Sequence, residues 1–112
     1  MKQEILEYNK IKYIIEIGEN KYDNFEIIDK AEKSDIWFHV DGLPSCHVIL
    51  KTHEKIKHIP LYIIKQCAYL CKINSKAKTL QKCGICYTTI DNISKTDIIG
   101  QVNIKNFKVV YV

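Results

Sequence analysis

The side chains of this sequence best suited to chemistry lie in the stretch from Asp35 to Leu50. An acid, Asp35, is followed at short spacing by two of the four histidines, His39 and His47. An aspartate that orients an imidazole is the usual arrangement of a general base, and two histidines with an aspartate can also bind a metal ion. The competing interpretation is a structural hydrogen-bond network that braces a turn. Because no serine or cysteine nucleophile stands at a helix start or a glycine-rich turn, we favour the structural interpretation and expect no enzymatic activity.

The elements that position these side chains are two strands joined by a tight turn. Residues 36–40 and 47–50 are rich in β-branched and aromatic side chains, whereas residues 41–44 have the composition of a turn. Successive side chains of a strand point to opposite faces. We therefore expect one wholly apolar face toward the core, opposite a face with an acid, an indole and an imidazole. The first face consists of Ile36, Phe38 and Val40, and the second of Asp35, Trp37 and His39.

The rest of the chain predicts an α+β fold. We expect residues 1–112 to form a single compact domain, a mainly antiparallel sheet of about six strands packed on one main helix at about residues 60–73. Apolar side chains recur at helical spacing there, after a proline suited to the first turn. A shorter helix is expected at residues 24–33, with Asn24 as its N-cap. The remaining strands are expected at residues 3–8, 11–17, 83–90, 99–104 and 107–112, the last two forming a closing hairpin.

The charges are unevenly distributed along the chain. Residues 1–50 contain 6 lysines against 10 acidic residues, residues 51–82 contain 8 lysines against Glu54 alone, and the whole chain carries a net charge of +4. Such a basic block is typical of a surface that binds an anionic partner; the alternative is a solvated lysine-rich helix face. The chain contains no arginine, so bidentate reading of guanine by a guanidinium group is excluded. The composition favours recognition of a nucleic-acid backbone over sequence reading.

The five cysteines include a Cys-x-x-Cys pair, Cys83 and Cys86, and a pair at helical spacing, Cys67 and Cys71. This spacing is compatible with a zinc site. However, the first pair begins a predicted strand, and the second lies on the apolar stripe of a predicted helix, where cysteine behaves as a small hydrophobe. We therefore expect free thiols, no metal and no cofactor. An odd cysteine count without a secretory signal or membrane-spanning run favours a cytoplasmic protein.

The stretch from Asp35 to Leu50 resembles the signature of a known family. The signature is Asp-x-Trp-Phe-His, then a turn that contains proline, a small residue, histidine and valine. It is similar to that of the NFACT-R domain, a module of the NFACT proteins of ribosome-associated quality control and of smaller stand-alone proteins. One departure is Ser45-Cys46, where many members have Gly-Ser. The matching residues are Asp35, Trp37, Phe38, His39, Pro44, His47 and Val48.

The resemblance extends from about Ile11 to Val112 and implies nucleic-acid binding without catalysis, with tRNA or rRNA as the expected partner. We expect lysines to contact phosphates, and Trp37, His39 and His47 to supply local recognition or to support it. Two alternatives stay open: a protein-interaction module that docks on ribosomal or translation factors, and a small metal-dependent nuclease that uses Asp35, His39 and His47. The expected phosphate-binding lysines are Lys51, Lys55, Lys57, Lys72, Lys76, Lys78 and Lys82.

Overall fold

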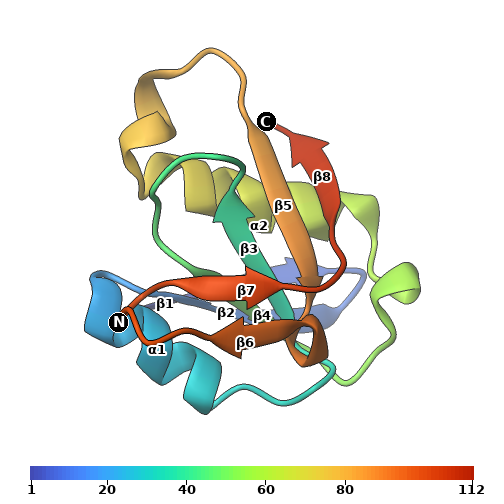
Figure 1. The fold of residues 1–112 in the computed structure, drawn as a ribbon. Helices are drawn as coiled ribbons and strands as arrows, with labels where there is room; N and C mark the ends of the chain where they lie inside the picture. Colours follow the sequence, from blue (N-terminus) through green and yellow to red (C-terminus); the bar gives the residue numbers. More distant parts are fainter.

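The computed structural model describes residues 1–112 and arranges them around a six-stranded sheet whose neighbouring strands are all antiparallel (Figure 1). The strand order in space is β1-β2-β4-β3-β5-β8. The predicted α+β architecture is thereby confirmed, and the signature strand β3 lies inside the sheet, between β4 and β5. The strands of this sheet are β1 (Lys2–Tyr8), β2 (Ile11–Ile17), β3 (Ile36–Val40), β4 (Val48–Lys51), β5 (Gly84–Thr89) and β8 (Lys108–Tyr111).

Both faces of the sheet are covered, by different elements (Figure 1). Helix α2 (Leu61–Ile73) packs on one face, and helix α1 (Lys21–Asp29) packs on the other together with a two-stranded sheet, β6 (Ile93–Lys95) and β7 (Val102–Ile104). Three short 3₁₀ helices complete the fold: η1 (Ile56–His58), η2 (Lys76–Thr79) and η3 (Ile90–Asn92). Neither helix has the length and apolar character that crossing a bilayer requires.

The larger core lies between the sheet and α2, as the apolar face of β3 predicts. Ile36, Phe38 and Val40 are at most 1% exposed and belong to the same cluster as the buried side chains of α2. Burying each side chain of this size contributes about 1.5–3 kcal/mol. The predicted main helix is confirmed, with Pro60 as the residue that immediately precedes it. The smaller core, on the opposite face, surrounds Trp37.

Helix α1 begins earlier than predicted. Its N-cap is Asn20, not Asn24, because Asn20 has an extended backbone and its side chain accepts a hydrogen bond from the Asp23 N–H at 2.9 Å. Asn24 is instead buried inside the helix, where its Oδ1 accepts from the backbone N–H of His47 at 3.1 Å. The residue predicted as a cap therefore ties the helix to the signature segment.

The predicted closing hairpin of residues 99–104 and 107–112 is wrong. Strand β7 pairs with β6, whereas β8 pairs with β5 at the edge of the main sheet. The two strands serve different layers, because the apolar side chains of β6 and β7 cover the core around Trp37 while Val110 of β8 enters the core under α2. A local hairpin would leave the Trp37 face without its cover.

Candidate nucleic-acid interface

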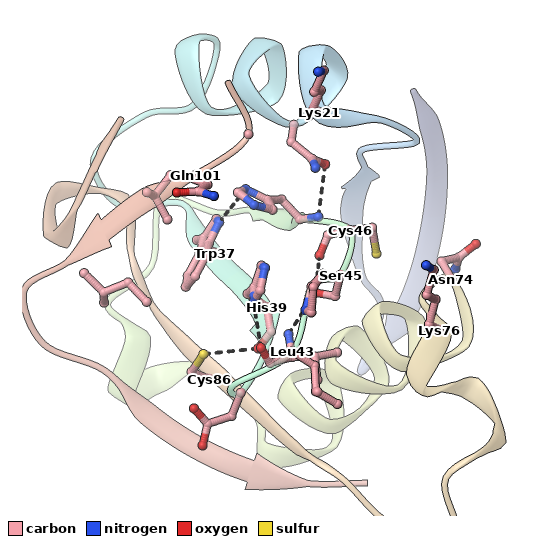
Figure 2. A pocket seen from close by; sticks show the side chains of 18 of the residues that line it. Lys21, Trp37, His39, Leu43, Ser45, Cys46, Asn74, Lys76, Cys86 and Gln101 are labelled. Carbon is pink, nitrogen blue, oxygen red and sulfur yellow. Dashed lines mark hydrogen bonds between the residues drawn. The ribbon is translucent and has the colours of Figure 1, made fainter. Parts of the chain in front are cut away.

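The main sheet and the elements on its Trp37 side enclose a pocket of about 870 Å³ (Figure 2). Its lining comes from the end of β3, the loop of residues 41–47, the start of α1, the turn between β6 and β7, and the start of η2. Its size falls within the range of about 300–1,000 Å³ that is usual for small-molecule sites. Four of the seven signature residues therefore line one pocket: Trp37, His39, Pro44 and His47.

Trp37 and His47 form the floor of the pocket, and both are only 1% exposed. The indole Nε1–H of Trp37 donates to Nδ1 of His47 at 3.1 Å. His47 hydrogen-bonds the backbone of Gly100 as well, and because its Nδ1 accepts, its Nε2–H is the donor to the Gly100 carbonyl. Burial, and secondly the nearby His39, lowers the pKa of His47 to about 3, so the ring is neutral at pH 7. With both ring nitrogens occupied, His47 supports the site and does not contact a ligand.

His39 lies above this floor and lines the pocket. Its ring stacks on Trp37 with centroids 5.5 Å apart, and it meets His47 edge-on at 5.1 Å. Its Nδ1 lies 2.6 Å from the carbonyl oxygen of Val40 and must donate, because a carbonyl only accepts. Burial lowers the pKa of His39, which keeps the ring neutral and leaves Nε2 as a lone-pair acceptor. Figure 2 shows the ring between Trp37 and Ser45.

Stacking of a nucleic-acid base on Trp37 is not available in this arrangement. One face of the indole is covered by His39, and the side chain is almost completely buried. Trp37 therefore supports the pocket. Of the three residues expected to supply local recognition, Trp37, His39 and His47, only His39 is placed to meet a ligand.

The loop of residues 41–47 is held rigidly at the rim of the pocket. The hydroxyl of Ser45 accepts from the Val40 N–H at 3.0 Å and donates to the Cys46 carbonyl at 2.9 Å. The thiol of Cys46 donates to the carbonyl of Cys71 on α2 at 3.5 Å. These bonds fasten the loop to β3 and to α2.

Asp35 is not part of the pocket. Its carboxylate accepts from the backbone N–H groups of Glu32 and Thr52, both at 2.9 Å, and pairs with Nζ of Lys51 at 2.6 Å. Asp35 thus fastens the start of β3 to the end of β4. The structure brings His39 and His47 together and places the predicted third member of the group elsewhere.

The predicted basic surface is divided by the fold. Lys51 is paired with Asp35, and Lys72 is buried, with its Nζ donating to the backbone oxygens of Gln81 and Val112 at 3.3 and 3.2 Å. The other five predicted lysines are exposed, at opposite ends of α2, which spans about 20 Å. Lys55 and Lys57 precede the helix, whereas Lys76, Lys78 and Lys82, hereafter the η2 lysines, follow it.

Only one of the predicted lysines, Lys76, lines the pocket, and it is joined by Lys21, which the sequence did not single out. Lys21 belongs to the acidic half of the chain, and only folding brings it next to the turn between β6 and β7. Gly100 of that turn could have indicated this contact from the sequence. It lies inside a predicted strand, where a glycine often marks a close approach of another backbone segment. Its α-carbon position leaves no room for a side chain: an added Cβ would lie 2.8 Å from Cβ of Lys21.

The four cysteines considered as zinc ligands do not converge. Cys67, Cys71 and Cys83 belong to the core under α2, whereas Cys86 belongs to the core around Trp37, on the other face of the sheet. The Cys86 thiol donates to the His39 carbonyl at 3.2 Å, and burial raises its pKa to about 11. The absence of a bound metal stays a prediction.

The fold has a close counterpart among solved structures. The C-terminal part of the fibronectin/fibrinogen-binding protein from Streptococcus suis superposes with a TM-score of 0.85, over 100% of this chain and 46% of that chain, at 24% sequence identity. This likeness defines the fold class. Residues 5–106 match the NFACT protein RNA binding domain, and the chain belongs to that family.

Two relatives illustrate the family. Coiled-coil domain-containing protein 25 from Bos taurus is 39% identical to this chain, over 93% of the chain and 54% of the relative. Protein JLP2 from Saccharomyces cerevisiae is 32% identical, over 86% of the chain and 50% of the relative. The chain spans about half the length of these relatives. The family membership inferred from the signature around Trp37 is therefore confirmed.

Proposed function

We propose that this domain binds RNA through the η2 lysines and the adjoining pocket. The observation that carries the proposal is the position of Lys76, which lines the same pocket whose floor is built from the family signature residues Trp37 and His47. The name of the family supports RNA as the ligand. We propose tRNA or rRNA as the natural partner, in the cytoplasm, within translation and ribosome-associated quality control.

The role we propose is binding without catalysis. The two clustered histidines are neutral, and the acid that would orient a catalytic imidazole, Asp35, is engaged with backbone groups outside the pocket. Lysines neutralise phosphates as point charges, and no arginine is present to read base edges. Binding should therefore follow the backbone and shape of the RNA rather than its sequence.

The test is a salt titration of RNA affinity. The chain and its variants are mixed with labelled tRNA, single-stranded RNA, duplex RNA and DNA, and the dissociation constant is measured against salt concentration. Each lost phosphate contact should reduce the slope of log K against log salt by about 0.7–0.9, so Lys76→Glu, Lys78→Glu and Lys82→Glu together should reduce it by about 2–3. We expect a loss of affinity of at least about tenfold.

The matched control reverses three lysines that lie away from the pocket: Lys10→Glu, Lys12→Glu and Lys30→Glu. It changes the net charge equally, so it should reduce affinity much less if the η2 lysines form the site. Equal losses from both triple variants would show that net charge alone governs binding. No RNA binding by the unmodified chain at low salt would refute the proposal.

The protein-docking alternative is favoured by a different observation. The outer face of α2 exposes large apolar side chains at helical spacing, which is unusual for a helix that contacts only water. They are Leu61, Tyr62, Tyr69 and Ile73. Association with ribosomes that survives removal of accessible RNA, and is lost in Leu61→Ser with Tyr69→Ser, would favour this function.

A further inference from the structure

The charge of the pocket is balanced. Lys21 and Lys76 line it, but so do the carboxylates Glu19 and Asp41, and the histidine on its wall is neutral. A phosphate buried in such a cavity would gain little net attraction while losing its hydration. The interior therefore suits an uncharged group, and the phosphates of a bound strand would lie outside, within reach of the lysines.

The wall of the pocket combines large apolar side chains with an imidazole acceptor, Nε2 of His39. Leu43, Ile99 and Phe107 line it and are each at least 43% exposed, so they offer contact area to a planar ring. Nε2 of His39 is instead a polar group. Because Nδ1 of the same ring donates to the Val40 carbonyl, Nε2 carries the lone pair and can accept a hydrogen bond. A ligand that fits this wall is flat, has apolar faces and carries an N–H at its edge.

Building on the RNA binding proposed above, we propose that the pocket takes one unpaired nucleobase, which donates an N–H of its Watson–Crick edge to Nε2 of His39. All four RNA bases carry such an N–H, so the contact does not depend on sequence. In a duplex the same edge is occupied by the complementary base. The pocket would thus select an unpaired nucleotide, while Lys21 and Lys76 contact the phosphates on either side of it.

The experiment uses fluorescence anisotropy to compare three RNA hairpins that share one stem and are each closed by a loop of abasic nucleotides, so that the loop offers no base. The first has a blunt end, the second a short single-stranded 3′ extension, and the third the same extension with abasic nucleotides, which keep every phosphate. Stacking contacts to a base strengthen binding by about tenfold, so the second hairpin should bind roughly tenfold more tightly than the third. The third should exceed the blunt hairpin only by the effect of its added phosphates.

Two variants assign this preference to the pocket. His39→Phe keeps an aromatic ring on Trp37 but removes the acceptor, and should abolish the preference for the intact extension over the abasic one. Phe107→Ala removes an exposed side chain that lines the pocket, so it should fold normally and reduce the preference at least about threefold. Tyr69→Ala, which removes an equally exposed aromatic ring from α2, is the matched control and should leave the preference unchanged.

The outcomes separate this inference from the proposed function. If intact and abasic extensions bind alike, with affinity still dependent on salt and on the η2 lysines, the nucleobase pocket is refuted and RNA binding stands. If no hairpin binds, both fall. If His39→Phe does not fold, the decision rests on Phe107→Ala, and an unchanged preference in that variant refutes the pocket.

Discussion

The indole N–H of Trp37 donates to Nδ1 of His47 at 3.1 Å, and both side chains are almost completely buried. This single bond joins the central strand β3 to the residue that precedes β4. It also sets the tautomer of His47, whose other nitrogen then donates to Gly100 in the turn between β6 and β7. Three elements around the pocket are therefore connected through one imidazole.

Replacing Trp37 by phenylalanine should destabilise the protein. The substitution leaves the buried Nδ1 of His47 without a donor, at a cost of about 1–3 kcal/mol, and the smaller ring adds the cost of a cavity. We expect the free energy of unfolding, measured by urea denaturation followed by circular dichroism, to fall by about 2–4 kcal/mol. The exposed Tyr69→Phe should change it by less than about 0.5 kcal/mol. A loss as small as in this control would mean that the hydrogen bond is unimportant.

Acid should destabilise the fold at mildly acidic pH. The folded pKa of His47 is about 3, whereas the ordinary value is 6.5, so the unfolded chain binds this proton first. The corresponding stability is complete above pH 6.5 and is lost as the pH falls from 6.5 toward 3, at about 1.4 kcal/mol per pH unit. The lowered pKa of His39 acts in the same direction.

Urea denaturation at pH 7, 6 and 5 checks this expectation. The exposed His58→Gln variant is the control, and it should retain the same dependence on pH. Stability that does not change between pH 7 and pH 5 would contradict a neutral, buried His47.

Neutralising Lys51 should mainly lower stability, whereas neutralising Lys78 should mainly weaken RNA binding. Lys51→Gln removes the cation from the buried carboxylate of Asp35 and should lower the free energy of unfolding by about 1–2 kcal/mol, since Lys51 is partly exposed. Its effect on RNA affinity should be small, because Asp35 already balances its charge. Lys78→Gln should leave stability unchanged and weaken RNA binding about two- to fivefold. The reverse pattern in the two assays would remove Lys78 from the site.

Gly100 should tolerate a methyl group less well than Gly42. Both have positive φ, 88° and 74°, which costs an alanine about 1–2 kcal/mol. Around Gly42 the space is open, but at Gly100 the new Cβ would lie 2.8 Å from Cβ of Lys21, so backbone must also move. We expect Gly100→Ala to destabilise the protein by at least about 1 kcal/mol more than Gly42→Ala, measured by thermal or urea unfolding. Equal losses would indicate that the turn moves freely.

Local patterns predicted the main sheet strands and α2 well. Alternation in β3 identified Ile36, Phe38 and Val40 as core residues because that periodicity follows from strand geometry alone. The signature around Trp37 identified the family for a similar reason, since its residues are contiguous in sequence. The roles of these residues were harder to predict, because burial, which makes Trp37 and His47 supporting residues, depends on α1 and the second sheet.

Features that depend on distant contacts were missed. Strands β7 and β8 are neighbours in sequence, yet each pairs with a partner chosen by which core it covers. Lys72 resembles the other lysines in its sequence surroundings, but its position on the inner side of α2 turns its ammonium group toward backbone oxygens. Charge counted along the chain does not distinguish such a lysine from an exposed one.

The stacking of His39 on Trp37 also has a practical consequence, because Trp37 is the only tryptophan of the chain. All indole emission originates at the floor of the pocket, and an adjacent imidazole quenches it more strongly once protonated. A ligand that engages Nε2 of His39 would alter that quenching without any attached label. The protein thus carries an intrinsic fluorescent probe in the floor of the pocket, and a change in its emission would report that a ligand has bound there.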